Sequence, residues 1–335
     1  MSTNTMSDVH EADRLWDEMP LEDVADRTGA ADKELQPVLE KGKNAIQKAT
    51  QQYEPTAYFA GFSGGDDSLV ATDFLHRLMP ERARTVHINT GIGFQATRDY
   101  VRSMCQEQGW RLEEIRAKED CGQDYDEIVR GNEEVPGGFP GPAAHQPPNS
   151  YIYDRLKGRA VCKLHRDWKE ERGDKILLIT GIRKDESERR MGYDDTVIDQ
   201  DPAFPGVIWV NPIYFMTAAG RDRYIKERVL RRNPVTKICG TSGECLCGAF
   251  DEDGKALGEL KAQCKLLGEM DLYERILSLQ DEIFDEYPWR YDGRPPPWYG
   301  EAKEGQMALE GLPESEKQNR LAQRMCAGCG KGSAK

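Results

Sequence analysis

The sequence predicts a parallel, doubly wound (Rossmann-like) α/β domain followed by a helical extension that carries cysteines. Three observations support this prediction. Short apolar runs alternate with segments of helical period from residue 56 onward, which is typical of parallel sheets with right-handed crossovers. A glycine-rich turn, "SGGDD", follows the first apolar run. Three of the nine cysteines lie close together, between residues 239 and 247.

The first half of the domain alternates strands and helices. Residues 32–53 have helical spacing that Pro37 interrupts, and "TAYFAGF" at 56–62 predicts a buried strand. The next helix, 66–80, has apolar side chains at every fourth position. A second strand (84–90), a second helix (96–110) and a third strand (111–117) follow.

The second half repeats the alternation after a long irregular segment. Residues 131–150 contain five prolines and no periodicity, and we expect a lid on the substrate side, with an ordinary surface excursion as the alternative. The remaining predicted elements are a helix at 151–172, strands at 175–181 and 206–213, a helix at 218–232 that Pro234 ends, and helices at 255–268 and 271–286.

These patterns divide the chain into four parts. They are an acidic leader and helix (1–45), the main α/β domain (46–235), a cysteine-cluster and helical extension (236–286), and a tail with a C-x-x-C pair (287–335).

Charge and hydropathy exclude some classes of protein. No apolar run is long enough to span a membrane, the N-terminal residues do not form a signal peptide, and a cytoplasmic protein is expected. The net charge of −13 disfavours a stable complex with nucleic acid. Residues 221–232 carry six Arg or Lys, and a solvated helix face is favoured over a nucleic-acid patch there.

The "SGGDDS" segment at 63–68 has the design of a phosphate loop. Glycines let the backbone turn its N–H groups toward an anion, and the start of a helix adds partial positive charge. Ser63 and Ser68 add hydroxyl donors. The segment matches neither GxxxxGK[ST] nor GxGxxG, so an ordinary P-loop and a nicotinamide site are disfavoured.

The same segment resembles SGGxDS, the pyrophosphate loop of the PP-loop ATP pyrophosphatases, in the adenine nucleotide alpha-hydrolase superfamily. "HINTGIGFQAT" (87–97), "ITGIRKDESERR" (179–190) and "NPIYFMT" (211–217) resemble further motifs of its 3′-phosphoadenylylsulfate (PAPS) reductase branch. The resemblance implies ATP and magnesium as cofactors. It implies catalytic roles for Ser63, Asp67, Ser68 and Arg183. It implies nucleotide contacts from Ser63, Gly64, Gly65, Asp66, Asp67, Ser68, Thr90, Gly91, Gly181 and Arg183.

The chain departs from the family pattern at three positions. Asp66 stands where many relatives have lysine, Asn89 replaces an acidic residue, and Ala96 replaces a glutamate. The carboxylates of Asp66 and Asp67 can reach a magnesium ion through water. A loop that binds nucleotide without cleaving it stays open as an alternative. Two further arginines, 189 and 190, either meet an anion or pair with surface carboxylates.

The cysteine spacing C-x5-C-x-C at 239–247 is typical of a metal site in a cytosolic protein. By resemblance to sulfate reductases with a [4Fe–4S] cluster, the ligands would be Cys162, Cys239, Cys245 and Cys247, and zinc is the alternative metal. Cys326 and Cys329 form a separate late C-x-x-C pair, for which a zinc half-site, a redox pair and a replacement ligand set are the alternatives. Cys105, Cys121 and Cys264 are expected to be packing residues.

The chain lacks the E-C-G-[LI]-H segment that supplies the nucleophile in reductive members of the family. It therefore resembles more closely the members that act in DNA phosphorothioation and nucleic acid thiolation. That resemblance implies ATP cleavage to AMP and pyrophosphate, sulfur supplied by a cysteine desulfurase and only brief contact with nucleic acid. A homodimer is compatible with it. A PAPS or adenylylsulfate reductase and a non-catalytic nucleotide-binding protein are the alternatives.

Overall fold

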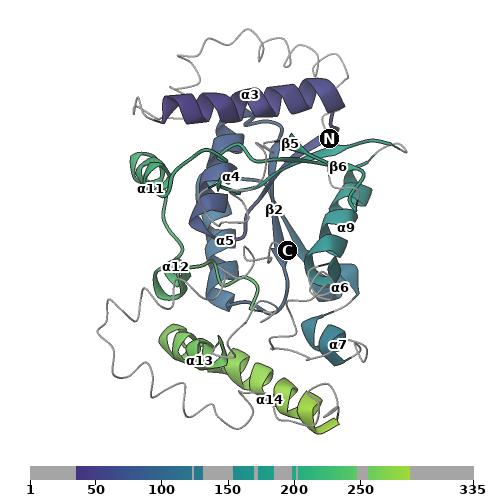
Figure 1. The fold of residues 1–335 in the computed structure, drawn as a ribbon, viewed down its shortest axis with the longest axis vertical. Coiled ribbons are helices and arrows are strands. Elements are labelled where there is room, and N and C mark those ends of the chain that lie inside the picture. Colours follow the sequence, from purple (N-terminus) through teal and green to yellow (C-terminus); the bar gives the residue numbers. More distant parts are fainter. Residues whose placement is uncertain are drawn as a thin grey trace, which may run out of the picture.

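A six-stranded sheet lies at the centre of the molecule, with the strand order β3-β2-β1-β4-β6-β5 in the part of the chain that the structure describes (Figure 1). The computed structural model describes residues 35–122, 124–130, 154–169, 173–184, 198–200, 203–246 and 256–286. The strands are β1 (Ala57–Gly61), β2 (Ala83–Asn89), β3 (Leu112–Arg116), β4 (Ile176–Ile179), β5 (Ile198–Asp199) and β6 (Val207–Val210). The predictions for the leader, the 131–150 lid and the tail from 287 lie outside the described residues.

Five of the six strands are parallel, which confirms the predicted fold class. The central strand β1 pairs with β2 on one side and with β4 on the other, so that Phe59 stands opposite Arg84 and Leu178. All of β4 is buried, as a strand covered by helices on both faces must be. Only β5 is antiparallel, paired with the edge of β6. The sequence analysis missed β5 because two residues are too short to show a period.

In the described part of the chain, four helices cover one face of the sheet. They are α3 (Gln36–Tyr53), α4 (Asp66–Leu78), α5 (Gln95–Gln108) and α11 (Ala218–Glu227). Their apolar side chains form one core with the strands, in which Ile46, Phe74 and Met104 are fully buried. Pro37 lies in the first turn of α3 and does not interrupt the helix, because the N–H group that proline lacks has no helical partner at that position.

The opposite face is covered by α6 (Ala117–Cys121) and by α9 (Arg159–Trp168), which follows the π-helical turn η2 (Asp154–Gly158) (Figure 1). Ala160, Val161 and Leu164 of α9 are buried against the sheet. The ring of Trp168 meets that of Phe59 edge-on, with centroids 5.5 Å apart.

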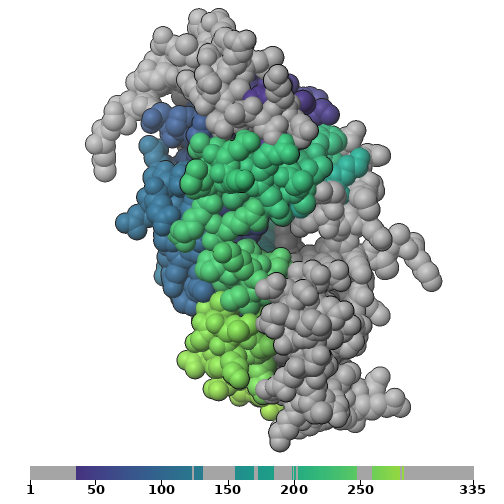
Figure 2. Space-filling model, turned by 90° about the vertical axis from the view of Figure 1, so that its left-hand side faces the viewer, coloured from purple at the N-terminus to yellow at the C-terminus, as the bar shows by residue number. Residues whose placement is uncertain are grey.

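A third cluster lies beyond the carboxyl ends of the strands. It is built by the turn after β2 and by α7 (Tyr125–Arg130), α12 (Pro234–Cys239), α13 (Ala256–Leu267) and α14 (Met270–Glu286). Figure 2 shows the segment 203–246, in green, beside the blue part of the chain and above the yellow-green α13 and α14. The predicted helix at 218–232 ends early, at Glu227, and Pro234 begins α12.

No helix in the described ranges has the length and apolar character needed to cross a membrane.

Candidate functional site

The "SGGDDS" segment at 63–68, called the PP-loop below, joins β1 to α4 at the carboxyl edge of the sheet. Gly64 has φ +82°, and a Cβ there would lie 2.8 Å from Thr97 Cγ2, so the turn requires glycine. Ser68 Oγ donates to the carbonyl of Gly65 (2.8 Å) and lies 3.2 Å from Ser63 Oγ. The two hydroxyls therefore gather beside the first turn of α4, where N–H groups lack helical partners and favour an anion.

Arg183, a site residue predicted from the sequence, follows β4, and its side chain contacts this loop. Its side chain is 6% exposed, and its Nε donates to Asp67 Oδ1 over 2.7 Å. A second bond from its Nη1 to the carbonyl of Met216 (3.3 Å) fixes the guanidinium. Arg183 is thus held at the start of α4, as the position of the residue after β4 predicts for an open α/β sheet.

Two further arginines, which no sequence motif marks, reach the loop. Arg221, on α11, donates from Nη1 to Asp67 Oδ1 (3.2 Å), and Arg232 donates from Nη1 to Asp66 Oδ2 (2.7 Å). Both also donate to Asp222. Burial raises the pKa of Asp66, although the charges of Arg232 and Arg221 oppose that effect.

Gly181 and Thr90, which were expected to contact the nucleotide, have visible structural roles. A Cβ on Gly181 would lie 2.6 Å from the backbone carbon of Asp67 and from the nitrogen of Ser68, so this glycine lets β4 approach the loop. Thr90 is fully buried, and its hydroxyl donates to the carbonyl of Glu244 (2.8 Å). Gly91 is exposed and has φ +72°. Direct nucleotide contacts by these residues stay predictions.

The cysteine segment, residues 239–246, docks on the turn after β2. Leu246 N–H donates to the carbonyl of Ile92 (2.7 Å), and Phe94 N–H donates to that of Gly243 (3.0 Å). Ser242 brings the same segment next to the PP-loop. A Cβ built on Gly65 would lie 3.6 Å from the Cβ of Ser242. The segment that bears the clustered cysteines therefore lies directly beside the phosphate loop.

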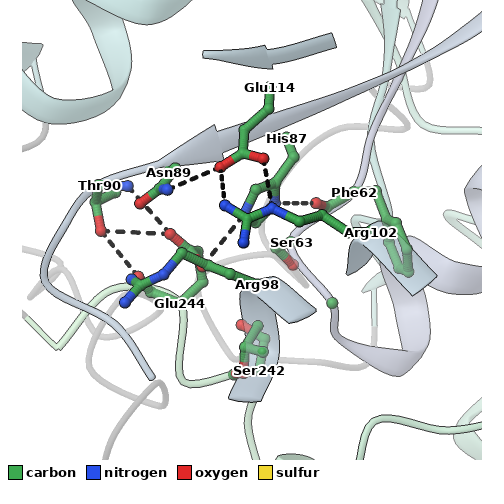
Figure 3. Close-up of polar contacts among 12 residues, drawn as sticks. Phe62, Ser63, His87, Asn89, Thr90, Arg98, Arg102, Glu114, Ser242 and Glu244 are labelled. Atoms are coloured by element: carbon green, nitrogen blue, oxygen red, sulfur yellow. Dashed lines mark hydrogen bonds and ion pairs between the residues drawn. The ribbon is translucent and has the colours of Figure 1, made fainter. Parts of the chain in front are cut away.

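A buried ion pair joins the same segment to β2 (Figure 3). His87 Nε2 lies 3.4 Å from Glu244 Oε2, and its Nδ1 is 2.8 Å from the carbonyl oxygen of Phe62, the residue before the PP-loop. Glu244 Oε1 accepts from Thr90 N–H (3.1 Å). The ring of His87 thus bridges the loop and the cysteine segment.

The described residues do not assemble the predicted cluster ligands. Cys239 ends α12 and is fully buried among apolar side chains, and Cys245 is partly buried. Cys162 is exposed on α9, which covers one face of the sheet. Cys239 lies on α12, which packs against α5, a helix of the other face. Cys247 lies outside the described residues, as do Arg189, Arg190, Cys326 and Cys329. Within the described ranges no three His, Cys, Asp or Glu are grouped to hold a metal ion, and the four-cysteine site stays a prediction. Cys105 and Cys264 are buried packing residues, as expected.

The C-terminal helices complete the edge of the site. Glu269, between α13 and α14, accepts from the N–H groups of Gln95 (2.7 Å) and Ala96 (2.8 Å), and so caps α5. Arg275 of α14 pairs with Asp126 (2.7 Å) and donates to the carbonyl of Gly91 (2.9 Å). The helical extension therefore contributes side chains to the same edge of the α/β domain as the PP-loop.

The family model for the phosphoadenosine phosphosulfate reductase domain matches residues 57–238, from β1 to the residue before Cys239. The chain belongs to the phosphoadenosine phosphosulfate reductase family. The matched range includes the PP-loop, Arg183 and the two arginines that no sequence motif marks, Arg221 and Arg232. No curated protein matches the sequence.

Several solved structures are similar to this PAPS reductase family member at low identity. The PAPS reductase from Candida auris is 15% identical, over 69% of this chain and 91% of its own, with a TM-score of 0.40. FMN adenylyltransferase from Candida glabrata is 12% identical, over 69% of each chain, with a TM-score of 0.44. A U34-tRNA thiolase from Methanococcus maripaludis, solved with its [4Fe–4S] cluster, is 15% identical, over 90% and 86%, with a TM-score of 0.41.

Proposed function

We propose that this protein cleaves ATP to AMP and pyrophosphate in order to activate an acceptor for sulfur transfer, as in DNA phosphorothioation or nucleic acid thiolation. One observation carries the proposal. The PP-loop and the cysteine segment, which are more than 170 residues apart in the sequence, lie against each other where Ser242 meets Gly65. A phosphate-binding loop and a thiol-bearing segment thus share one edge of the sheet.

The chain's own residues suggest how such a reaction would proceed. The N–H groups that open α4, with Ser63 and Ser68, would hold the β and γ phosphates, and Arg183 would offset the charge of the departing pyrophosphate. An acceptor oxygen would bond to the α-phosphorus while the bond from that phosphorus to the bridging oxygen breaks. AMP would then leave when a sulfur nucleophile attacks the activated acceptor.

Magnesium fits the loop, because Asp66 and Asp67 supply the carboxylate oxygens that this ion prefers. When bound, it would neutralise phosphate charge. The proposal requires no other metal for the activation step.

The iron–sulfur cluster is a separate part of the proposal. Its support is the C-x5-C-x-C spacing and the docking of that segment beside the PP-loop. The cluster needs Cys162 and Cys247 to join Cys239 and Cys245, and zinc on the same ligands is the alternative.

The partners and the compartment are part of the same proposal. Sulfur would come from a cysteine desulfurase. The net charge of −13 favours only brief contact with nucleic acid, in the cytoplasm. A homodimer is compatible with this function.

Pyrophosphate release from ATP tests the proposal. Anaerobically prepared protein with magnesium should release pyrophosphate, and DNA or tRNA should stimulate release if either is the acceptor. Ser63→Ala should slow release about 10-fold or more, because a hydrogen bond to a charged phosphate contributes ~1.5–3 kcal/mol. Ser278→Ala, an exposed serine of α14, is the matched control and should be neutral.

Two other outcomes would favour the alternatives. Sulfite produced from PAPS or adenylylsulfate, without pyrophosphate from ATP, would identify a reductase. Tight ATP binding with no product would identify a non-catalytic nucleotide-binding protein.

A further inference from the structure

Arginines from outside the PP-loop hold both aspartates that open α4. Arg232 donates to Asp66 Oδ2 over 2.7 Å, and Arg221 shares Asp67 Oδ1 with Arg183. Asp66 occupies the position where many relatives carry lysine. The PP-loop itself contains no lysine or arginine, but the guanidinium of Arg232 places a positive charge beside Asp66.

The backbone around Arg232 lies directly against the loop. The next residue, Asn233, is fully buried, and its Nδ2 donates to the carbonyl of Gly64 (3.1 Å). The same side chain caps α12 by accepting from the N–H group of Val235 (3.0 Å). Arg232 is thus anchored beside the glycines that would receive the phosphates.

Among the described residues, the charges of this cluster are balanced. Three arginines (183, 221 and 232) are paired there with three aspartates (66, 67 and 222). Paired in this way, the arginines exert little net attraction on a polyanion. Phosphate oxygens that enter the loop would compete with the aspartates for the same guanidinium groups.

We propose that Arg232 and Arg221 bind the phosphate groups of the nucleotide by exchanging their carboxylate partners for phosphate oxygens. This inference rests on the proposed use of ATP and names the residues that recognise its phosphates. A planar guanidinium suits bidentate phosphate contacts.

The carboxylate partners are suited to release. Asp222, which both arginines share, is 48% exposed, so breaking its pairs costs little. Asp66 is imperfectly paired, because its Oδ1 is buried and has no hydrogen-bond partner among the residues that the structure describes.

Two opposite substitutions in one ion pair test the exchange. ATP binding is measured by calorimetry in magnesium-free buffer, where no metal recruits the carboxylates. Arg232→Gln removes the cation and should weaken ATP binding about 10-fold or more, since charge-assisted contacts to phosphate are strong. Asp66→Asn removes the competitor and should leave ATP binding as tight as in the wild type, or tighter.

A purely structural pair would give a different result. Either substitution breaks that pair equally, so equal weakening by Arg232→Gln and Asp66→Asn would overturn the inference. Wild-type affinity in Arg232→Gln would also overturn it. Adenosine, which lacks phosphates, should bind equally to all variants, and a loss of adenosine binding in Arg232→Gln would count against a phosphate contact.

Two further variants control for an effect of Arg232→Gln on folding. Arg231→Gln breaks the neighbouring exposed pair with Glu107 (2.7 Å) and should not change ATP binding. If Arg232→Gln does not fold, Asp222→Asn takes its place as a surface variant. It frees both arginines, so tighter or equal ATP binding supports the exchange and weaker binding overturns it.

The wild type separates the two proposals. If it releases pyrophosphate while Arg232→Gln binds ATP normally, only the exchange fails. If it neither binds nor cleaves ATP, the proposed function fails first and the exchange with it.

Discussion

His87 Nε2 lies 3.4 Å from Glu244 Oε2, and both side chains are buried. The pair joins the end of β2 to the cysteine segment, and the other ring nitrogen of His87 reaches the carbonyl of Phe62. Burial alone would lower the pKa of His87, but the nearby negative charge of Glu244, helped by the contact with the Phe62 carbonyl, outweighs burial and raises the pKa above its usual value of 6.5. The histidine is therefore stabilised in its charged form.

The first prediction concerns stability and pH. Because the pKa of His87 is higher in the folded protein than in the unfolded chain, the contribution of the pair is complete below pH ~6.5 and is lost as pH rises through the folded-state pKa. Glu244→Gln should lower the free energy of unfolding at pH 6 by about 3 kcal/mol, the usual cost of breaking a buried pair. The variant should also lose less stability between pH 6 and pH 8.5 than the wild type.

Urea unfolding at the two pH values measures this effect. Glu113→Gln, which breaks the surface pair with Arg84, is the control and should change stability by less than about 1 kcal/mol. The same pH dependence in the wild type and in Glu244→Gln would show that His87 is neutral in the folded protein.

The second prediction concerns the cap of α5. The family's glutamate at position 96 is alanine here, and the carboxylate of Glu269 instead accepts from the N–H groups of Gln95 and Ala96. Glu269→Ala should lower the free energy of unfolding by about 1–2 kcal/mol, as the loss of a helix cap usually does. Glu274→Ala, an exposed glutamate on α14, is the control for thermal unfolding. Equal melting temperatures for the two variants would contradict a capping role.

The sheet could be predicted from the sequence because its signals are local. The central strands β1 and β4 are short runs of almost wholly buried residues, and the glycine turn lies directly between β1 and α4. Arg183 was also predictable, since a residue that follows a parallel strand lies at the ligand-binding edge.

The rest of the site depends on long-range contacts that no local pattern reveals. Asp67 and Arg221 are separated by 154 positions, and Gln95 and Glu269 by 174. In the sequence, residues 221–232 show only a charged helix face. Their contacts with the PP-loop form only when α11 folds back against α4 and brings Arg221 and Arg232 to the loop.

The third prediction concerns a strained residue after α11. Val229 has φ +52°, in the left-handed region that disfavours a β-branched side chain, and it is 86% exposed. Val229→Gly should raise the free energy of unfolding by about 1 kcal/mol, because glycine adopts this conformation without strain. Val229→Ala, which keeps a Cβ, should gain less in the same denaturant titration. A destabilised glycine variant would mean that the valine makes a compensating contact.

The fourth prediction concerns the cysteine segment. If Cys245 is a cluster ligand, Cys245→Ala should remove the brown colour and the iron of anaerobically purified protein. Cys121→Ala is the control, because Cys121 lies on α6, outside the predicted ligand set. Metal analysis after purification decides the outcome. Full retention of iron in Cys245→Ala would remove this residue from the ligand set, and loss of zinc in place of iron would identify the alternative metal.

The fifth prediction concerns two glycines at the edge of the sheet. A Cβ on Gly181 would lie 2.6 Å from the backbone of Asp67 and Ser68, whereas a Cβ on Gly61 would make an ordinary contact, 3.5 Å from the carbonyl oxygen of Ile179. Gly181→Ala must therefore push β4 and the PP-loop apart, at a cost of about 1–3 kcal/mol, as is usual for overpacking. Because the displaced backbone carries the N–H groups that would hold phosphate, ATP binding should weaken in Gly181→Ala and stay unchanged in Gly61→Ala. Calorimetric titration with ATP, beside thermal unfolding of both variants, compares them. Unchanged ATP affinity in a destabilised Gly181→Ala would mean that the phosphates bind away from the first turn of α4.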